Sequence, residues 1–316
     1  MSVLVSEKNN PIYEEIKALP CFAQGYCNVT PIIGGESHVC FKVDLSKDGT
    51  ETSYFVKSLA GHQETAKAEV AVNLLAAEAG LAPTIAYHSP LWLVCEYIHG
   101  ESLERFSVEK ASLTSHDKIM ITMNLMSKVH QLKHPNNHPV LAINELLLNL
   151  AGDIKATHLQ QAFVNEVIEK IMPLQLTSDN LVLCHGDVNY ENIRLSDSFN
   201  KDHLLEKTWL VDFECSCLAE AEYDIAMFIA INALNAEDVE VVIKRYQQYT
   251  KIRVDDAKVR TYLACCYLIN GLWYLKLAID DKKNLIARLK SRQQLVFFDQ
   301  LMLLKNQAVN FFDGLI

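Results

Sequence analysis

Polar residues interrupt two apolar runs in "LVLCHGDVNYENIRL", residues 181–195, in the order HxDxxxxN. His185, Asp187 and Asn192 make up this order, and functional side chains concentrate on polar loops of this kind, held by a rigid scaffold. A second strand-like segment, "TWLVDFE", carries Asp212 near its end. A hairpin between the two segments would bring both aspartates and the asparagine to one edge.

These side chains suit phosphoryl transfer. That reaction needs a carboxylate to orient the attacking hydroxyl and accept its proton, and oxygen ligands for the magnesium ions that neutralise the phosphate charge. Asp187, Asn192 and Asp212 supply such groups, whereas a polar turn would explain any one of them alone. His185 is expected to brace the loop through hydrogen bonds, so we leave it out of the catalytic set.

A lysine and a glutamate upstream extend the pattern. Lys57 lies in the middle of the apolar strand "YFVKSL", where an ammonium is costly unless its charge is paired. Glu69, on the following helical segment, is a candidate partner, and a Lys–Glu pair of this kind aligns the nucleotide phosphates in kinases. Taken alone, the lysine would be interpreted as a strand residue with a solvated head and the glutamate as a surface residue.

Four segments resemble the aminoglycoside phosphotransferase and choline kinase superfamily, which comprises small-molecule kinases. "HGDVNYENI" is similar to the family's HGDxxxxNI loop and "LVDFE" to its IDFE or IDWE strand. "EYDIA" resembles the YDLA-type segment that follows, and "LMSKVHQL" the LxxLH helix. The resemblance extends from about Pro31 to about Lys276.

This resemblance implies an α+β, protein-kinase-like bilobal fold with ATP and Mg²⁺ as cofactors. A small antiparallel-sheet N-lobe would occupy residues 1–97 and bind the nucleotide. A larger, mainly helical C-lobe would occupy residues 98–316 and carry the catalytic loop and the acceptor site. By the same resemblance Asp187 would be the catalytic base, and Asn192 and Asp212 would be the magnesium ligands.

The residues that the resemblance implies at the nucleotide all belong to the N-lobe or its end: Lys57, Glu69, Gly34, Gly35, Glu96 and Ile98. The lysine and the first glutamate would form the ion pair that positions the phosphates. Glu96 and Ile98 would offer backbone groups to the adenine. The Gly-Gly turn lacks the GxGxxG pattern and is equally explained as a hairpin turn.

For the acceptor, the sequence predicts a chemical class but no single compound. Acidic side chains crowd residues 206–224, which favours a positively charged alcohol, and Glu214 and Trp273 are the candidate substrate residues. Cys215 and Asn270 stand where the family commonly has the aromatic rings that surround choline, so choline, a primary amine, thiamine and an amino-sugar remain open alternatives. The stretch after the DFE motif is too short for a protein-kinase activation loop and no APE follows, so we expect no protein substrate.

The predicted elements divide the chain into two parts of different character. A helix over residues 11–20 precedes strands in "NVTPIIGGESHVCFKVDL" and "TSYFVKSL", and an Ala-rich helix over 63–79 ends at Gly80. "TIAYHS" and "LWLVCEYI" are predicted as two further strands. After a junction near residues 96–102 the pattern becomes helical, over 115–133, 157–172, 222–249 and, in pieces, 255–314.

Composition and charge indicate which class of partner and which cellular compartment to expect. The 316 residues carry a formal charge of −10, which argues against general nucleic-acid binding and suits a cationic small molecule. No secretory signal is expected, and the most apolar segment, "TYLACCYLINGLWYLKLAI", is interrupted by Asn270 and Lys276, so we expect a buried helix and no membrane span. Nine cysteines without a CxxC pair indicate a reducing, cytoplasmic location.

Two other functions stay open at this point. A kinase-like binding protein without catalytic activity would use the same fold, although the presence of Asp187, Asn192 and Asp212 argues against it. A metal-dependent hydrolase could use His185 with the two aspartates, but the surrounding sequence offers no HExxH motif.

Overall fold

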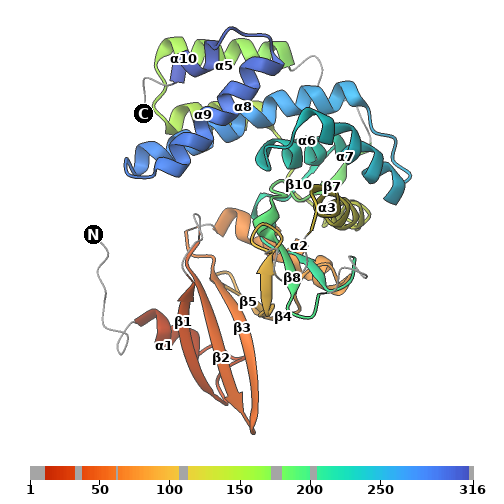
Figure 1. The fold of residues 1–316 in the computed structure, drawn as a ribbon. Helices are drawn as coiled ribbons and strands as arrows, with labels where there is room; N and C mark the ends of the chain where they lie inside the picture. The colour runs from red at the N-terminus through yellow and green to blue at the C-terminus, as the bar shows by residue number, and fades with distance from the viewer. Residues whose placement is uncertain are drawn as a thin grey trace. The chain divides into compact units, whose positions relative to one another are not determined.

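The computed structural model describes residues 11–32, 38–61, 63–106, 113–171, 180–199 and 205–312. They form two compact units: Met1–Ser102 with Arg194–Glu214, and Leu103–Ile193 with Cys215–Ile316. The fold is α+β, as predicted, with an antiparallel sheet in the first unit and mainly helices in the second (Figure 1).

The first unit is built on a five-stranded antiparallel sheet of order β1-β2-β3-β5-β4. Its strands are β1 (Tyr26–Ile32), β2 (Cys40–Lys47), β3 (Thr50–Ser58), β4 (Ile85–His88) and β5 (Trp92–Glu96). The turn from β2 to β3 is Asp48-Gly49, and both residues have positive φ, at 52° and 77°. Two-residue turns of this handedness match the twist of a hairpin, so this turn sets the register that places Lys57 opposite Cys40.

Helices cover the sheet with apolar side chains. α1 (Pro11–Lys17) contributes Ile16 to a cluster with Phe22 and with the buried face of the sheet, which includes Val43 and Val56. Every second residue of β2 is buried, as expected for a strand with one face against a core. α2 (Gln63–Glu78) packs Ala66 against buried residues of β5 and of the segment after β3. Gly80 follows α2 at φ +73°, which confirms the predicted helix end.

A second, three-stranded sheet has the order β6-β8-β9, from β6 (Gly100–Ser102), β8 (Ile193–Ser196) and β9 (Thr208–Leu210). The neighbouring β8 and β9 confirm the hairpin predicted after the HxDxxxxN loop. Because β8 and β9 join β6, the structure groups Arg194–Glu214 with the first unit, whereas the division predicted at residue 97 assigned that segment to the C-lobe.

The second unit is mainly helical, with a short antiparallel pair, β7 (Val182–Cys184) and β10 (Cys217–Ala219). Its helices are α3 (Ser115–Val129), α4 (Ile143–Asp153), α5 (His158–Ile171), α6 (Ala221–Ile231), α7 (Ala236–Tyr249), α8 (Asp256–Asp280), α9 (Leu285–Leu301) and α10 (Gln307–Phe312). α4 was not predicted from the pattern of apolar residues. α6 and α7 were predicted as one stretch, whereas Ala233 interrupts them at φ +48°.

α8 is the core helix of this unit. By length and composition it could cross a membrane, but 78% of its most apolar window is buried inside the protein. α9 packs closely along it, because a Cβ at Gly271 would lie only 2.8 Å from the side chain of Leu295, and Ser291 Oγ donates to the Gly271 carbonyl at 2.8 Å. The prediction of a buried helix is confirmed.

Candidate active site

The HxDxxxxN loop begins with a turn that requires glycine. Gly186 follows β7 with φ +80°, and a Cβ there would overlap the carbonyl oxygen of Cys215. A side chain is disfavoured both by the left-handed backbone and by this contact. Glycine at this position therefore allows the chain to turn sharply out of the strand, directly before Asp187.

A buried carboxylate on α6 fixes the loop. Asp224 is fully buried and accepts hydrogen bonds from the backbone N–H groups of His185 and Gly186, both at 2.9 Å. Nε2 of His130, on the segment after α3, lies 3.0 Å from the same carboxylate, and its Nδ1 lies 2.7 Å from the Tyr246 hydroxyl. Burial alone would raise the pKa of Asp224, but the hydrogen bond and charge of His130 lower it. Asp224 therefore fixes the start of the HxDxxxxN loop.

His185 is fully buried, and its Nδ1 accepts a hydrogen bond of 3.3 Å from the Asp187 backbone N–H. This contact confirms that the histidine braces the loop. A fully buried ring in this position is unsuited to hold a solvent-exposed catalytic metal, which removes the main support for the hydrolase alternative.

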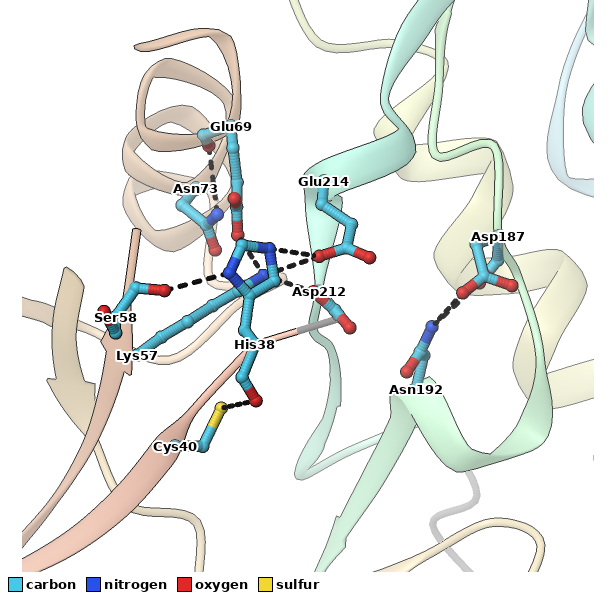
Figure 2. A network of polar contacts seen from close by, with 10 residues as sticks. All are labelled: His38, Cys40, Lys57, Ser58, Glu69, Asn73, Asp187, Asn192, Asp212 and Glu214. Carbon is cyan, nitrogen blue, oxygen red and sulfur yellow. Dashed lines mark hydrogen bonds and ion pairs between the residues drawn. The ribbon is translucent and has the colours of Figure 1, made fainter. Parts of the chain in front are cut away.

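Three amide hydrogen bonds orient the carboxylate of Asp187 and its backbone. Asn192 Nδ2 donates to the Asp187 Oδ2 (Figure 2) and to the Asp187 carbonyl oxygen, both at 3.0 Å. Asn189 Nδ2 donates to Asp187 Oδ1 at 3.0 Å. Because the amide nitrogen of Asn192 is committed to Asp187, its Oδ1 is the atom that remains for a metal ion. The structure thus brings Asp187 and Asn192, two of the predicted site residues, into hydrogen-bonding contact. Their roles as base and as magnesium ligand stay predictions.

In the first unit, Lys57 is the centre of a buried cluster of charges (Figure 2). Its Nζ lies 2.7 Å from Glu69 Oε1, 2.7 Å from Asp212 Oδ1 and 3.0 Å from Glu214 Oε2. Burial alone would lower the pKa of Lys57, but the three carboxylates raise it well above its usual value, so the ammonium stays charged. The ion pair expected between Lys57 and Glu69 is present; its action on phosphates stays a prediction.

The carboxylates of this cluster outnumber its cations. Burial raises the pKa of Glu69, and the negative charges of Asp212 and Glu214 raise it further, while Lys57 opposes the shift. An excess of negative charge of this kind can be relieved by a bound cation.

Asp212 has the features of a metal ligand. Its backbone is left-handed, with φ +69°, which costs a non-glycine residue roughly 1–2 kcal/mol. Its side chain is 39% exposed, and Oδ2 makes no hydrogen bond to another described residue. Carboxylate and amide oxygens are the ligands that Mg²⁺ prefers, so Asp212 Oδ2 and Asn192 Oδ1 fit the ion by type.

One member of the cluster was missed by the sequence analysis. His38 lies just before β2, with Nδ1 2.9 Å from the Ser58 carbonyl and Nε2 2.8 Å from Glu214 Oε2. Its side chain is only 5% exposed. His38 could have been predicted from its position next to an apolar strand, because a polar residue in an apolar strand is also what pointed to Lys57.

The residues predicted at the adenine lie at the end of β5. The Glu96 N–H donates to the Thr84 carbonyl at 2.8 Å and the Tyr97 N–H to the Ser53 carbonyl at 3.0 Å. The Ile98 N–H makes no hydrogen bond to another described residue, so it offers a backbone donor. Gly34 and Gly35 lie outside the described residues.

The two predicted substrate residues occupy different units. Glu214 belongs to the cluster around Lys57, and its Oε2 contacts both Lys57 and His38. Trp273 is half-buried on α8, and its ring packs edge-on against Tyr274 with centroids 5.1 Å apart. Their roles at the acceptor stay predictions.

The acidic stretch after Asp212 is largely neutralised by partners. Glu220 accepts from Lys258 at 2.5 Å and from the Tyr262 hydroxyl at 3.0 Å. Glu222 accepts from the Asp255 N–H at 3.0 Å. With Asp224 bound to the catalytic loop, these carboxylates stabilise the fold of the second unit and do not form a free anionic surface.

Comparisons with known proteins agree with this geometry. The family model described as "Phosphotransferase enzyme family" matches residues 28–262, more than half of the chain. The chain therefore belongs to that family of phosphotransferases. Among curated protein sequences, none matches the chain significantly.

Solved structures show the same fold at low sequence identity. A choline/ethanolamine kinase family protein from Mesorhizobium loti is 18% identical with a TM-score of 0.66, covering 96% of this chain and 98% of its own. Choline kinase from Cryptosporidium parvum is 16% identical, with a TM-score of 0.64 and coverages of 98% and 95%. A spectinomycin phosphotransferase in complex with ADP and spectinomycin is 16% identical, with a TM-score of 0.54 and coverages of 91% and 92%.

Proposed function

We propose that the protein transfers the γ-phosphoryl group of ATP, with Mg²⁺, to a hydroxyl group of a small, positively charged alcohol. Alcohols of the choline, ethanolamine, thiamine or amino-sugar type are the candidates. The observation that carries the proposal is the carboxylate of Asp187, oriented by two asparagine side chains on a loop that Asp224 clamps. A general base needs this kind of fixed orientation toward the hydroxyl that it activates.

In the proposed reaction Asp187 accepts the proton of the acceptor hydroxyl as the oxygen attacks the γ-phosphorus. The bond from that phosphorus to its bridging oxygen breaks, and ADP leaves with the bond's electron pair. Lys57 binds phosphate oxygens and neutralises part of their charge, held in place by Glu69 at 2.7 Å. When bound, Mg²⁺ supplies further charge neutralisation at the phosphates, and Asp212 and Asn192 are the residues that would hold it.

Two observations support a cationic acceptor. The formal charge of −10 attracts cations over distances longer than a direct contact. The similar structures named above are those of enzymes named for choline, ethanolamine and spectinomycin, and all three compounds are alcohols that carry an amine or ammonium group. The acidic stretch after Asp212 does not add to this support, because its carboxylates are engaged within the protein.

We place this activity in the cytoplasm, and the free state of all nine cysteines is consistent with a reducing compartment. We expect no nucleic-acid, membrane or protein partner beyond the small-molecule acceptor.

A screen with labelled ATP and Mg²⁺ against choline, ethanolamine, thiamine and aminoglycosides tests the proposal. We expect a phosphorylated product with at least one of these acceptors and none with Asp187→Asn protein. Nucleotide binding without transfer to any acceptor would favour the kinase-like binding protein. Preferred phosphorylation of a neutral polyol would reject the cationic acceptor but keep the kinase.

A further inference from the structure

The ammonium of Lys57 has no hydrogen left for a phosphate. A lysine ammonium has three N–H donors, and those of Lys57 point to Glu69, Asp212 and Glu214 at 2.7, 2.7 and 3.0 Å. A phosphate oxygen that binds this ammonium therefore has to replace one of the three carboxylates.

Of the carboxylates that contact Lys57, Glu214 can leave the lysine with the smallest loss of favourable contacts. Its contact with Lys57 is the longest of the three. The same oxygen, Oε2, lies 2.8 Å from His38 Nε2, so Glu214 keeps one strong donor after it leaves the lysine. Glu69, in contrast, is only 2% exposed, and Lys57 is the one charged partner recorded for its carboxylate among the described residues.

His38 is anchored independently of Glu214. Its Nδ1 lies 2.9 Å from the carbonyl of Ser58, the residue that follows Lys57 on β3, and the ring is almost fully buried. The Glu214 oxygen can accept a hydrogen bond, so a ring N–H of His38 that faces it donates to that carboxylate. The histidine thus adds a second fixed partner for Glu214 beside Lys57 (Figure 2).

We propose that His38 is a positioning residue for nucleotide binding: it retains Glu214 when a phosphate takes that carboxylate's place on Lys57. The inference rests on the proposed function, because it needs Lys57 to bind phosphate. Without the imidazole, Glu214 keeps its contact with Lys57 and competes with the phosphate for the same ammonium.

The test is a double-mutant cycle on nucleotide affinity, measured by calorimetry with ADP and with a non-hydrolysable ATP analogue. We expect His38→Ala to raise the Kd by about tenfold, the usual effect of losing a hydrogen bond to a charged group. Glu214→Ala should leave the Kd unchanged or lower it. In the Glu214→Ala background, adding His38→Ala should have little further effect, because the competing carboxylate is gone.

Matched variants separate this role from a structural one. His88→Ala and Glu51→Ala change exposed residues of the same sheet, on β4 and β3, and should leave the Kd at the wild-type value. His38→Gln keeps one amide donor and should restore part of the lost affinity. Thermal unfolding of each variant checks that the first unit remains folded.

Equal weakening by His38→Ala with and without Glu214 would overturn the inference, and so would an unchanged Kd. If wild-type protein binds neither nucleotide, the proposed function fails instead, so the two failures are distinguishable.

Discussion

At the scale of single residues, most polar side-chain atoms of the candidate site residues already have hydrogen-bond or ion-pair partners within the protein. The carboxylate of Asp187 is oriented by two amides, and Asn192 keeps only its oxygen for a ligand. Asp212 binds Lys57 with Oδ1 and leaves Oδ2 accessible. Asn192 and Asp212 therefore each offer one defined oxygen to a metal ion, and the carboxylate of Asp187 is held in a fixed orientation.

Asp187→Asn should remove turnover and preserve nucleotide binding. An asparagine keeps the shape but cannot accept the hydroxyl proton, so we expect kcat to fall by at least ~10²-fold, the usual minimum for a positioned base. Steady-state kinetics with the best acceptor, together with calorimetric nucleotide Kd values, measure the two effects. Glu191→Gln, a partly exposed neighbour on the same loop, is the control and should keep near-normal kcat. Normal turnover in the Asp187 variant would refute the assignment.

Asp212→Ala should raise the magnesium concentration needed for half-maximal turnover and weaken magnesium-dependent nucleotide binding. The substitution removes a carboxylate ligand from a hard cation, and it also removes a partner of Lys57. Titrations of activity and of nucleotide Kd against MgCl₂ check both effects, and Asn192→Ala should shift the same curves. A magnesium dependence identical to that of the wild type would exclude the mutated residue as a ligand.

At the scale of elements, the junctions between strands and loops position the chemistry. β7 ends in a glycine turn before Asp187, and the N-terminal part of α6 supplies Asp224 to clamp that turn. The segment before α4 is joined to β10 by backbone hydrogen bonds of Leu141 and Leu218, at 3.0 and 2.7 Å. A substitution at one of these contacts is therefore expected to disturb the catalytic loop.

Gly186→Ala should destabilise the protein by about 2 kcal/mol or more, because the backbone is left-handed and the added Cβ meets the Cys215 carbonyl. We also expect a loss of turnover, since Asp187 follows directly. Chemical unfolding gives the free energy. Gly152→Ala on α4 is the control: no atom lies within 4 Å of its added Cβ, so we expect it to stabilise the helix by about 0.5–1 kcal/mol. Similar effects of the two substitutions would contradict this account.

His138 should make the stability of the second unit sensitive to mild acid. Burial lowers the pKa of His138 from its ordinary value of 6.5. The folded protein thus binds this proton less readily than the unfolded chain. The stability contribution is fully present above about pH 6.5 and is lost as pH falls from there toward the lowered folded pKa.

The measurement is the free energy of unfolding at several pH values between about 7.5 and 5, a range that spans the ordinary histidine pKa. His138→Gln should lose less stability over this range than the wild type. His158→Gln, at an exposed position in α5, should follow the wild-type curve. Parallel curves for His138→Gln and the wild type would show that the histidine does not titrate as we expect.

At the scale of the whole molecule, net charge and not a local carboxylate is expected to attract a cationic acceptor. The chain carries −10, but the carboxylates nearest the DFE motif are bound by Lys57, His38, Lys258 and backbone groups. Attraction by the general field acts over distance and is weakened by salt, since the Debye length is ~8 Å at physiological ionic strength.

The KM for a cationic acceptor should therefore rise with ionic strength, while the KM for a neutral alcohol used by the same enzyme should not. Glu214→Gln should leave the acceptor KM unchanged, because its charge is already held by Lys57 and His38. Kinetics at several NaCl concentrations test both statements. A salt-insensitive KM for choline would indicate recognition by aromatic rings instead.

Several features of the protein followed from the sequence alone. The HxDxxxxN loop, the DFE segment and Lys57 within an apolar strand are local patterns that can be recognised beside the apolar residues of neighbouring strands, although the strand predicted to contain DFE ends at Leu210. The five strands of the N-terminal sheet and the buried character of α8 were also predictable, since the spacing of apolar side chains follows directly from strand and helix geometry.

Only the tertiary structure decided which charges are paired. Lys57 meets Glu214 across 157 positions of sequence, Lys258 meets Glu220 across 38, and His38 joins the cluster from the segment before β2. From the sequence, the acidic residues 206–224 were expected to favour a positively charged acceptor, whereas in the structure Glu214 holds Lys57 and Asp224 holds the catalytic loop. Neutralisation of a buried charge depends on distances between residues that are remote in sequence, and no local pattern encodes these distances.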